Sequence, residues 1–132
     1  MTKLIIFIHQ DSGDSGKLFK KAIDQVDKDV SFELYQDFTS FEAHLLRTGK
    51  FSKQTLYILF VDSKARLNKL MTFINLLDGR RLLVVGPDKK PETTSKILKL
   101  FPRFFTQIKS NYNDLCAVIK KMISREEEVP SE

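Results

Sequence analysis

The stretch TLYILFV, residues 55–61, decides the fold of this 132-residue chain. These seven residues carry no charge, and their continuous apolar character fits a strand that is buried on both faces. Two similar runs are found at residues 4–8 (LIIFI) and 82–85 (LLVV). Runs of this kind are typical of the central strands of a parallel sheet, because helices cover both faces of such strands.

Two further runs have the features of edge strands. VSFELYQ, residues 30–36, alternates apolar and polar side chains, and RFFTQIK, residues 103–109, is interrupted by polar residues. Helical patterns separate the five runs, and strict alternation of strand and helix predicts an α/β fold with a parallel sheet. Order 2-1-3-4-5 places the two polar runs at the edges, whereas order 3-2-1-4-5 would expose residues 55–61. We therefore predict a five-stranded parallel sheet in order 2-1-3-4-5 with helices on both faces, a flavodoxin-like arrangement.

Composition and length predict one domain over residues 1–124, followed by a flexible charged tail over residues 125–132. The single cysteine, Cys116, excludes an internal disulfide and favours a reducing cytoplasm. No apolar run approaches the ~20 residues that a membrane span needs. The net charge of +5 comes from basic residues spread over the polar faces of several helices. This spread is typical of a solvated surface and argues against nucleic-acid binding, which gathers basic residues on one face.

Polar residues at the boundaries of the helical patterns predict where the helices begin and end. Asp14 or Ser15 is expected to cap the first helix, and Thr39 or Ser40 the second. Gly49 is expected to end the second helix in the left-handed conformation. A single helix is expected over residues 64–77.

The residues that follow the strands carry the candidate chemistry. His9 and Gln10 follow the first strand, Asp62 in ILFVDS follows the third, and Lys109 in FTQIKS ends the fifth. Their positions, and the order of elements from residue 3 to about residue 123, resemble the receiver domain of two-component response regulators. In that family a carboxylate after the third strand accepts a phosphoryl group, and a lysine ending the fifth strand pairs with it. The resemblance assigns these roles to Asp62 and Lys109.

Several family positions depart from this pattern. The family ends its first strand with two adjacent acids that hold Mg²⁺, and here His9 and Gln10 stand in their place. Gly86 lacks the hydroxyl that the family has after the fourth strand, and Thr106 replaces an aromatic residue of the fifth. The resemblance therefore implies an atypical receiver, or pseudo-receiver, in which phosphorylation of Asp62 is lost or weak. Asp62 also fits a structural role, capping the following helix.

The loop HQDSGDSGK, residues 9–17, supports an alternative function, a small flavodoxin-like module that binds a ligand or phosphate. Ser12, Gly13 and Ser15 match most of the flavodoxin phosphate loop, although nearby carboxylates would repel a phosphate. A P-loop is excluded because required glycine and hydroxyl positions are missing, and a trypsin-like protease is excluded by the alternating strand–helix pattern. No cofactor is expected beyond a weak Mg²⁺ site formed by three carboxylates, those of Asp11, Asp14 and Asp62.

The receiver resemblance implies that a protein partner binds around the fifth strand and the helices beside it. An exposed aromatic set surrounded by basic residues suits an acidic partner patch or a homodimer. The expected surface residues are Lys96, Lys99, Arg103, Phe105, Tyr112 and Lys120. We expect a protein-binding signalling domain rather than an enzyme. His9, His44 and Cys116 are interpreted as structural residues.

Overall fold

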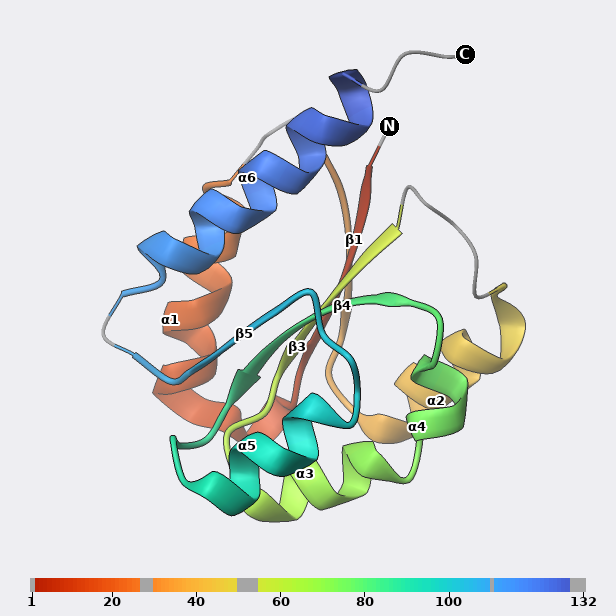
Figure 1. Cartoon of the computed structure of the whole chain (residues 1–132), viewed down its shortest axis with the longest axis vertical. Helices are drawn as coiled ribbons and strands as arrows, with labels where there is room; N and C mark the ends of the chain where they lie inside the picture. The colour runs from red at the N-terminus through yellow and green to blue at the C-terminus, as the bar shows by residue number, and fades with distance from the viewer. Residues whose placement is uncertain (1, 27–29, 50–54, 110, 129–132) are drawn as a thin grey trace.

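A computed structural model describes all residues except 1, 27–29, 50–54, 110 and 129–132, with the backbone alone described for 125–128. Five parallel strands form one sheet in the order β2-β1-β3-β4-β5 (Figure 1). The predicted flavodoxin-like topology is therefore confirmed. The strands are β1 (Lys3–Ile8), β2 (Ser31–Tyr35), β3 (Thr55–Phe60), β4 (Arg81–Gly86) and β5 (Phe104–Gln107).

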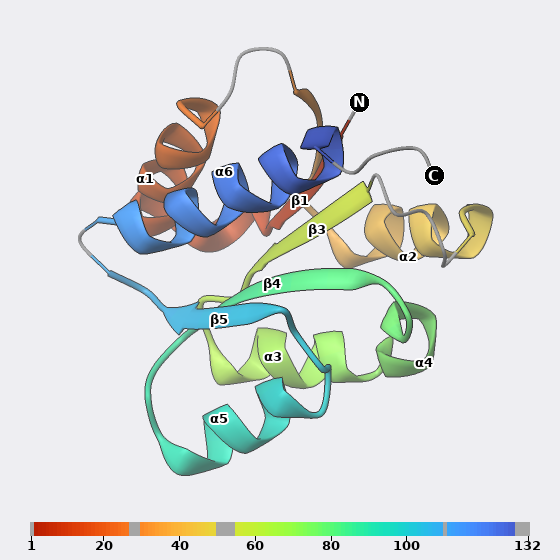
Figure 2. The ribbon, with the colours of Figure 1, turned by 45° about the horizontal axis from the view of Figure 1, so that its top comes forward.

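Helices cover both faces of this sheet. Figure 2 shows α1 and α6 on one side and α3, α4 and α5 on the other. The short helix η1 links β1 to α1, and α2 packs on the same face as α3. The helices are η1 (Gln10–Ser12), α1 (Gly13–Asp24), α2 (Phe38–Arg47), α3 (Lys64–Met71), α4 (Ile74–Leu77), α5 (Pro91–Leu98) and α6 (Asn113–Glu128).

Two apolar cores result from this layering. Side chains of the central strands alternate between the cores, as the twofold repeat of a strand requires. Ile6 and Ile58 pack with Phe19 of α1 and with α6. Ile5 and Leu59 pack on the opposite face with α2 and α3. Cys116 is half-buried beside the first core, where burial raises the pKa of its thiol, in keeping with the structural role predicted for it.

The predicted caps of the first two helices were wrong. Helix α1 begins at Gly13, so Asp14 and Ser15 lie inside its first turn, and its N-cap Ser12 makes no capping hydrogen bond through its side chain. Helix α2 begins after Asp37, whose carboxylate accepts a hydrogen bond of 2.7 Å from the N–H of Ser40. Asp37 precedes the expected caps Thr39 and Ser40 by two and three residues, and its carboxylate accepts the hydrogen bond that a hydroxyl was expected to accept. Helix α2 ends at Arg47, and its C-cap Thr48 has an extended backbone. Gly49 does not have the left-handed conformation that was predicted for it.

The expected helix over residues 64–77 is divided into α3 and α4. At the break, the N–H groups of Thr72 and Phe73 donate to carbonyls three residues back, those of Lys69 and Leu70. This tighter turn buries the Phe73 ring against Phe38, with ring centroids 5.9 Å apart. A continuous helix would carry one apolar stripe, and Phe73 lies outside it.

The last helix is longer than predicted. Helix α6 continues to Glu128, four residues beyond the expected end of the domain at residue 124. Serine, arginine and glutamate, the residue types at 124–128, are compatible with a helix. The charged character of this segment therefore did not indicate where the helix ends. The rest of the expected tail, residues 129–132, lies outside the described residues. Within the described part of the chain, no helix has the length and apolar character needed to cross a membrane.

Candidate functional site

The carboxyl ends of the parallel strands meet at one edge of the sheet, and Asp62, at the position of the family's phosphoacceptor, lies there two residues after β3. Its side chain is 13% exposed, and its Oδ1 atom lies 2.5 Å from Nη1 of Arg66. Arg66 belongs to the first turn of α3, which Ser63 caps by accepting a hydrogen bond from the Arg66 N–H. A separation of four residues brings the two side chains together. This spacing is visible in the sequence and could have revealed the pair.

Lys109, the predicted partner of Asp62, has a different acidic neighbour. Its Nζ atom lies 3.6 Å from Oδ2 of Asp114, in the first turn of α6. Among the ion pairs of the described residues, none joins Lys109 to Asp62. Each of the two charges is thus compensated locally, by Arg66 and by Asp114. The Asp62–Lys109 pair that the receiver resemblance implies is not formed in this structure.

The end of β1 offers no group of metal ligands. Nδ1 of His9 accepts a hydrogen bond of 3.1 Å from the N–H of Asp11, which makes His9 the cap of η1. The side chain of Asp11 is 73% exposed, and Asp14 also faces solvent. Over the described ranges, no three His, Cys, Asp or Glu side chains form a group that could hold a metal ion. The predicted Mg²⁺ site of Asp11, Asp14 and Asp62 is therefore not assembled, and the carboxylates of Asp11 in η1 and Asp14 in α1 face solvent.

The same loop also satisfies several of its own polar groups. The hydroxyl of Ser15 donates to the carbonyl of Ser12 at 3.0 Å. Gly13 has a φ of 63°, which a side chain would strain and which lets the chain turn from η1 into α1. Both features fit a tight structural turn. The two exposed carboxylates beside it oppose the binding of a phosphate at the start of α1.

The glycine at residue 86 has a structural explanation. A Cβ atom at Gly86 would lie 2.6 Å from Cδ1 of Ile97 in α5, so any larger residue would require Ile97 to move. Thr106 is buried on β5, and its carbonyl oxygen would lie 3.7 Å from the same Cβ atom. The close contact between α5 and β4 thus takes up the space that a hydroxyl side chain at residue 86 would need.

One residue of the predicted partner surface is not on the surface. Tyr112 is only 3% exposed and packs edge-on against Phe19, with ring centroids 5.0 Å apart. Burial raises the pKa of its phenol, whose oxygen accepts a hydrogen bond of 3.3 Å from the N–H of Lys109. The receiver resemblance placed Tyr112 on the partner surface because it lies between the fifth strand and the last helix. It precedes α6 and contributes to the first core instead.

The other predicted surface residues are accessible to different degrees. Lys99, Arg103, Phe105 and Lys120 are exposed. Lys96 is half-buried and donates to Oδ1 of Asn68 at 2.6 Å, which joins α5 to α3.

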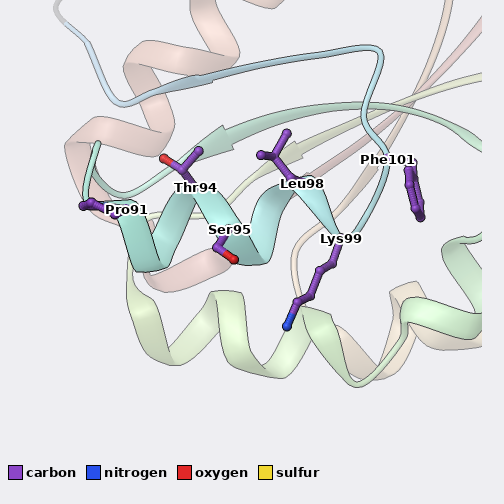
Figure 3. Close-up of a pocket in the computed structure, with 6 residues that line it drawn as sticks. All are labelled: Pro91, Thr94, Ser95, Leu98, Lys99 and Phe101. Carbon is purple, nitrogen blue, oxygen red and sulfur yellow. The ribbon is translucent and has the colours of Figure 1, made fainter.

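Two apolar residues of this surface were missed in the sequence. Leu98 is 50% exposed at the end of α5, and Phe101 is 81% exposed with a φ of 53°. Both line a groove along α5 with a volume of about 550 Å³. Figure 3 shows them among six of its lining residues. Exposure of a residue just beyond a helix end has no clear sequence signal, because periodicity stops there. We name as the α5–β5 face the residues Lys96, Leu98, Lys99, Phe101, Arg103 and Phe105.

A buried polar network under α2 was also missed. Arg80, which precedes β4, is 7% exposed, and its guanidinium donates to the carbonyls of Leu45, Thr48 and Leu76. Nη1 of Arg80 also donates to the hydroxyl of Tyr57 at 2.6 Å. Among the ion pairs of the described residues, none includes Arg80. Carbonyls at the end of α2 and the Tyr57 hydroxyl therefore stabilise this charge.

The hydrogen bonds of this network run in one direction. A guanidinium can only donate, so the Tyr57 hydroxyl accepts from Arg80. An ionised carboxylate can only accept, so the Tyr35 hydroxyl donates to Glu33. The Tyr35 hydroxyl then accepts from Nδ1 of His44 at 3.0 Å, and Nε2 of His44 accepts from the Tyr57 hydroxyl, 2.9 Å away. Neutral His44 therefore carries its proton on Nδ1. The structural role predicted for His44 is confirmed.

The pKa values of the network fit this direction. Burial lowers the pKa of His44, although Glu33 opposes the shift. Burial and the bond to Glu33 raise the pKa of Tyr35 to about 12. The pKa of Glu33 is lowered, mainly by its hydrogen bond to Lys3. At neutral pH the network thus holds a neutral imidazole between a cation and a carboxylate.

No protein-family model matches this chain, and no curated protein matches it. A functional conclusion therefore depends on the topology and on the residues described above.

Proposed function

We propose that this chain is a receiver-like signalling module that binds an acidic protein partner through the α5–β5 face, and that phosphorylation of Asp62 is lost or weak. The sheet order supports the receiver-like part of the proposal. Asp62 and Lys109 support it as well, since they follow β3 and β5 at the edge where ligands of such sheets bind.

The contacts of Asp62 support the loss of phosphorylation. Phosphoryl transfer needs a carboxylate oxygen free to attack and a cation that neutralises the charge of the phosphoryl group. One oxygen of Asp62 is engaged by Arg66. Mg²⁺ prefers oxygen ligands in octahedral geometry, and His9 and Gln10 replace the two acids of the family. These residues do not fit a Mg²⁺ ion, so we expect a module that binds its protein partner without phosphorylation of Asp62.

Phe101 is the observation that carries the proposal. A left-handed backbone costs a non-glycine residue about 1–2 kcal/mol, and glycine commonly occupies such positions after a helix. Here a phenylalanine adopts it with φ at 53° and leaves 81% of its surface in solvent. The fold gains little from this side chain. A residue that strains the backbone and exposes an aromatic ring is typical of a binding contact.

The charges of the α5–β5 face favour an acidic partner. Lys99 and Arg103 are exposed on either side of Phe101 in the sequence. A second copy of the chain, related by a twofold axis, would bring these like charges together. A different protein with carboxylates around an apolar contact would pair with them instead.

The test compares two exposed apolar positions. The wild-type chain is used to isolate a protein that binds it. The two variants compared are Phe101→Ser and Leu46→Ser, and Leu46 is an exposed residue of α2. The isolated protein is then purified, and its Kd for the wild type and each variant is measured by calorimetry at two salt concentrations. We expect Phe101→Ser to weaken binding about tenfold or more and Leu46→Ser to leave it within about twofold.

Three outcomes would contradict the proposal. Equal Kd values for wild type and Phe101→Ser would exclude the face, and a basic partner would exclude the charge argument. Self-association that Phe101→Ser abolishes in sedimentation velocity would assign the face to a second copy of the chain instead.

A further inference from the structure

A second groove lies at the opposite edge of the sheet, between α1 and the edge strand β2. Its volume is about 350 Å³. Helix α1 contributes Lys17, Lys20 and Lys21, β2 contributes Leu34, and Gln36 follows that strand. Neither the carboxyl-end residues Asp62 and Lys109 nor the α5–β5 face takes part in it.

The edge of β2 has backbone groups available for pairing. The carbonyl of Gln36 accepts a hydrogen bond of 2.9 Å from the N–H of Gln10, so it faces β1. Backbone groups of successive residues in a strand point to opposite sides, and alternate residues therefore face the free edge. By this alternation the backbone groups of Ser31, Glu33 and Tyr35 face outward. An extended segment could add to the sheet through them.

The groove has an apolar centre and a basic rim. Leu34 is 39% exposed, although it occupies the same face of β2 as the half-buried Phe32. Lys20 lies 2.5 Å from Asp24, which neutralises one ammonium group. Lys17 and Lys21 remain exposed on α1, so the rim has an excess of positive charge. An added strand presents every second side chain to the α1 face, so exposed Leu34 beside these two ammonium groups is complementary to a segment whose residues on that face are apolar and acidic in turn.

We infer that this groove binds an extended acidic peptide segment, which adds to the sheet as a strand beside β2. In this mode main-chain hydrogen bonds give affinity, and pockets for alternate side chains give specificity. An apolar side chain of the segment would cover Leu34, and carboxylates would contact Lys17 and Lys21. Because β2 and β5 are opposite edges, binding here is independent of the function proposed for the α5–β5 face.

The test uses one defined probe and nuclear magnetic resonance of the full chain labelled with ¹⁵N. The probe is the acetylated and amidated heptapeptide Glu-Thr-Val-Thr-Glu-Thr-Val, in which glutamate and valine take turns at every second position and therefore point to one face of an added strand. We expect saturable shifts of the amides of residues 31–36 and a Kd below about 1 mM. A fully N-methylated form of the peptide keeps the charges but lacks backbone donors, and we expect it to bind about tenfold more weakly.

Matched charge reversals identify the groove. The double variant Lys17→Glu and Lys21→Glu should bind the peptide about tenfold more weakly, whereas Lys120→Glu and Lys121→Glu, the same change on α6, should stay within about twofold. Equal weakening in both variants would overturn the inference in favour of non-specific charge attraction. Equal binding of the N-methylated peptide would overturn strand addition. The absence of saturable shifts at residues 31–36 would overturn the site itself, and none of these results bears on Phe101.

Discussion

The change Tyr57→Phe removes a single oxygen atom from the centre of the network under α2. That oxygen accepts from Arg80 at 2.6 Å and donates to Nε2 of His44 at 2.9 Å. Nη1 of Arg80 keeps a second acceptor, the hydroxyl of Thr48 at 3.0 Å. Nε2 of His44 loses the hydroxyl that donates to it, and this side chain is only 4% exposed. An unpaired buried polar group costs about 1–3 kcal/mol, so we expect the free energy of unfolding to fall by about 2 kcal/mol.

Equilibrium unfolding in urea at pH 7.5 measures this change. With a slope of about 1–3 kcal/mol per M, the midpoint should fall by about 1 M. Tyr112→Phe is the matched control, because Tyr112 has the same 3% exposure as Tyr57 but makes, among the described residues, a single long hydrogen bond, from Lys109 at 3.3 Å. We expect that control to cost less than about 1 kcal/mol. If Tyr57→Phe costs no more than Tyr112→Phe, the relay between Arg80 and His44 does not stabilise the fold.

Three further predictions concern pH, phosphorylation and backbone strain. Burial keeps the pKa of His44 below its ordinary 6.5, so the unfolded chain binds the proton more readily. The stability that His44 contributes is complete above pH 6.5 and is lost as the pH falls through its lower folded pKa, by at most about 1.4 kcal/mol per pH unit. Urea unfolding between pH 8 and 5 should therefore show a smaller loss in His44→Gln, and equal slopes would contradict this. Incubation with Mg²⁺ and acetyl phosphate should leave the intact mass largely unchanged, and a full adduct that Asp62→Asn abolishes would contradict the loss of phosphorylation. Phe101→Gly should raise the free energy of unfolding by about 1 kcal/mol by relieving the left-handed strain, and a fall would show that the ring stabilises the fold.

The sheet order could be predicted because the apolar or polar composition of each strand indicates whether that strand is buried on both faces or lies at an edge. Residues 55–61 are apolar throughout because helices cover β3 on both faces, and the polar interruptions of residues 30–36 and 103–109 marked the edges. Helix ends were predicted less well. Several polar residues compete for each cap, and Asp37 caps α2 although Thr39 and Ser40 are closer to its apolar stripe.

Most contacts of the candidate site could not be predicted, because they depend on which segments the fold brings together. Arg80 looks like a surface cation in the sequence, yet the end of α2 provides carbonyls that allow its burial. Tyr112 looks like part of a polar loop, yet its ring fills space beside Phe19. The Asp62–Arg66 pair is the exception, since a separation of four residues at the start of a helix predicts such a contact.

The anchoring of α2 by Arg80 has a consequence for how this domain opens. Nη2 of Arg80 donates to the carbonyls of Leu45 and Thr48, so unwinding the last turn of α2 would leave this nitrogen of a buried guanidinium without these acceptors. Helix α5 packs on β4 through Ile97, and its polar links to α3 include the exposed contact of Lys96 with Asn68. In native-state hydrogen–deuterium exchange, the amides of α2 should therefore exchange only in large cooperative openings, while those of α5 exchange through smaller ones. A peripheral helix would then belong to the most slowly exchanging part of the molecule.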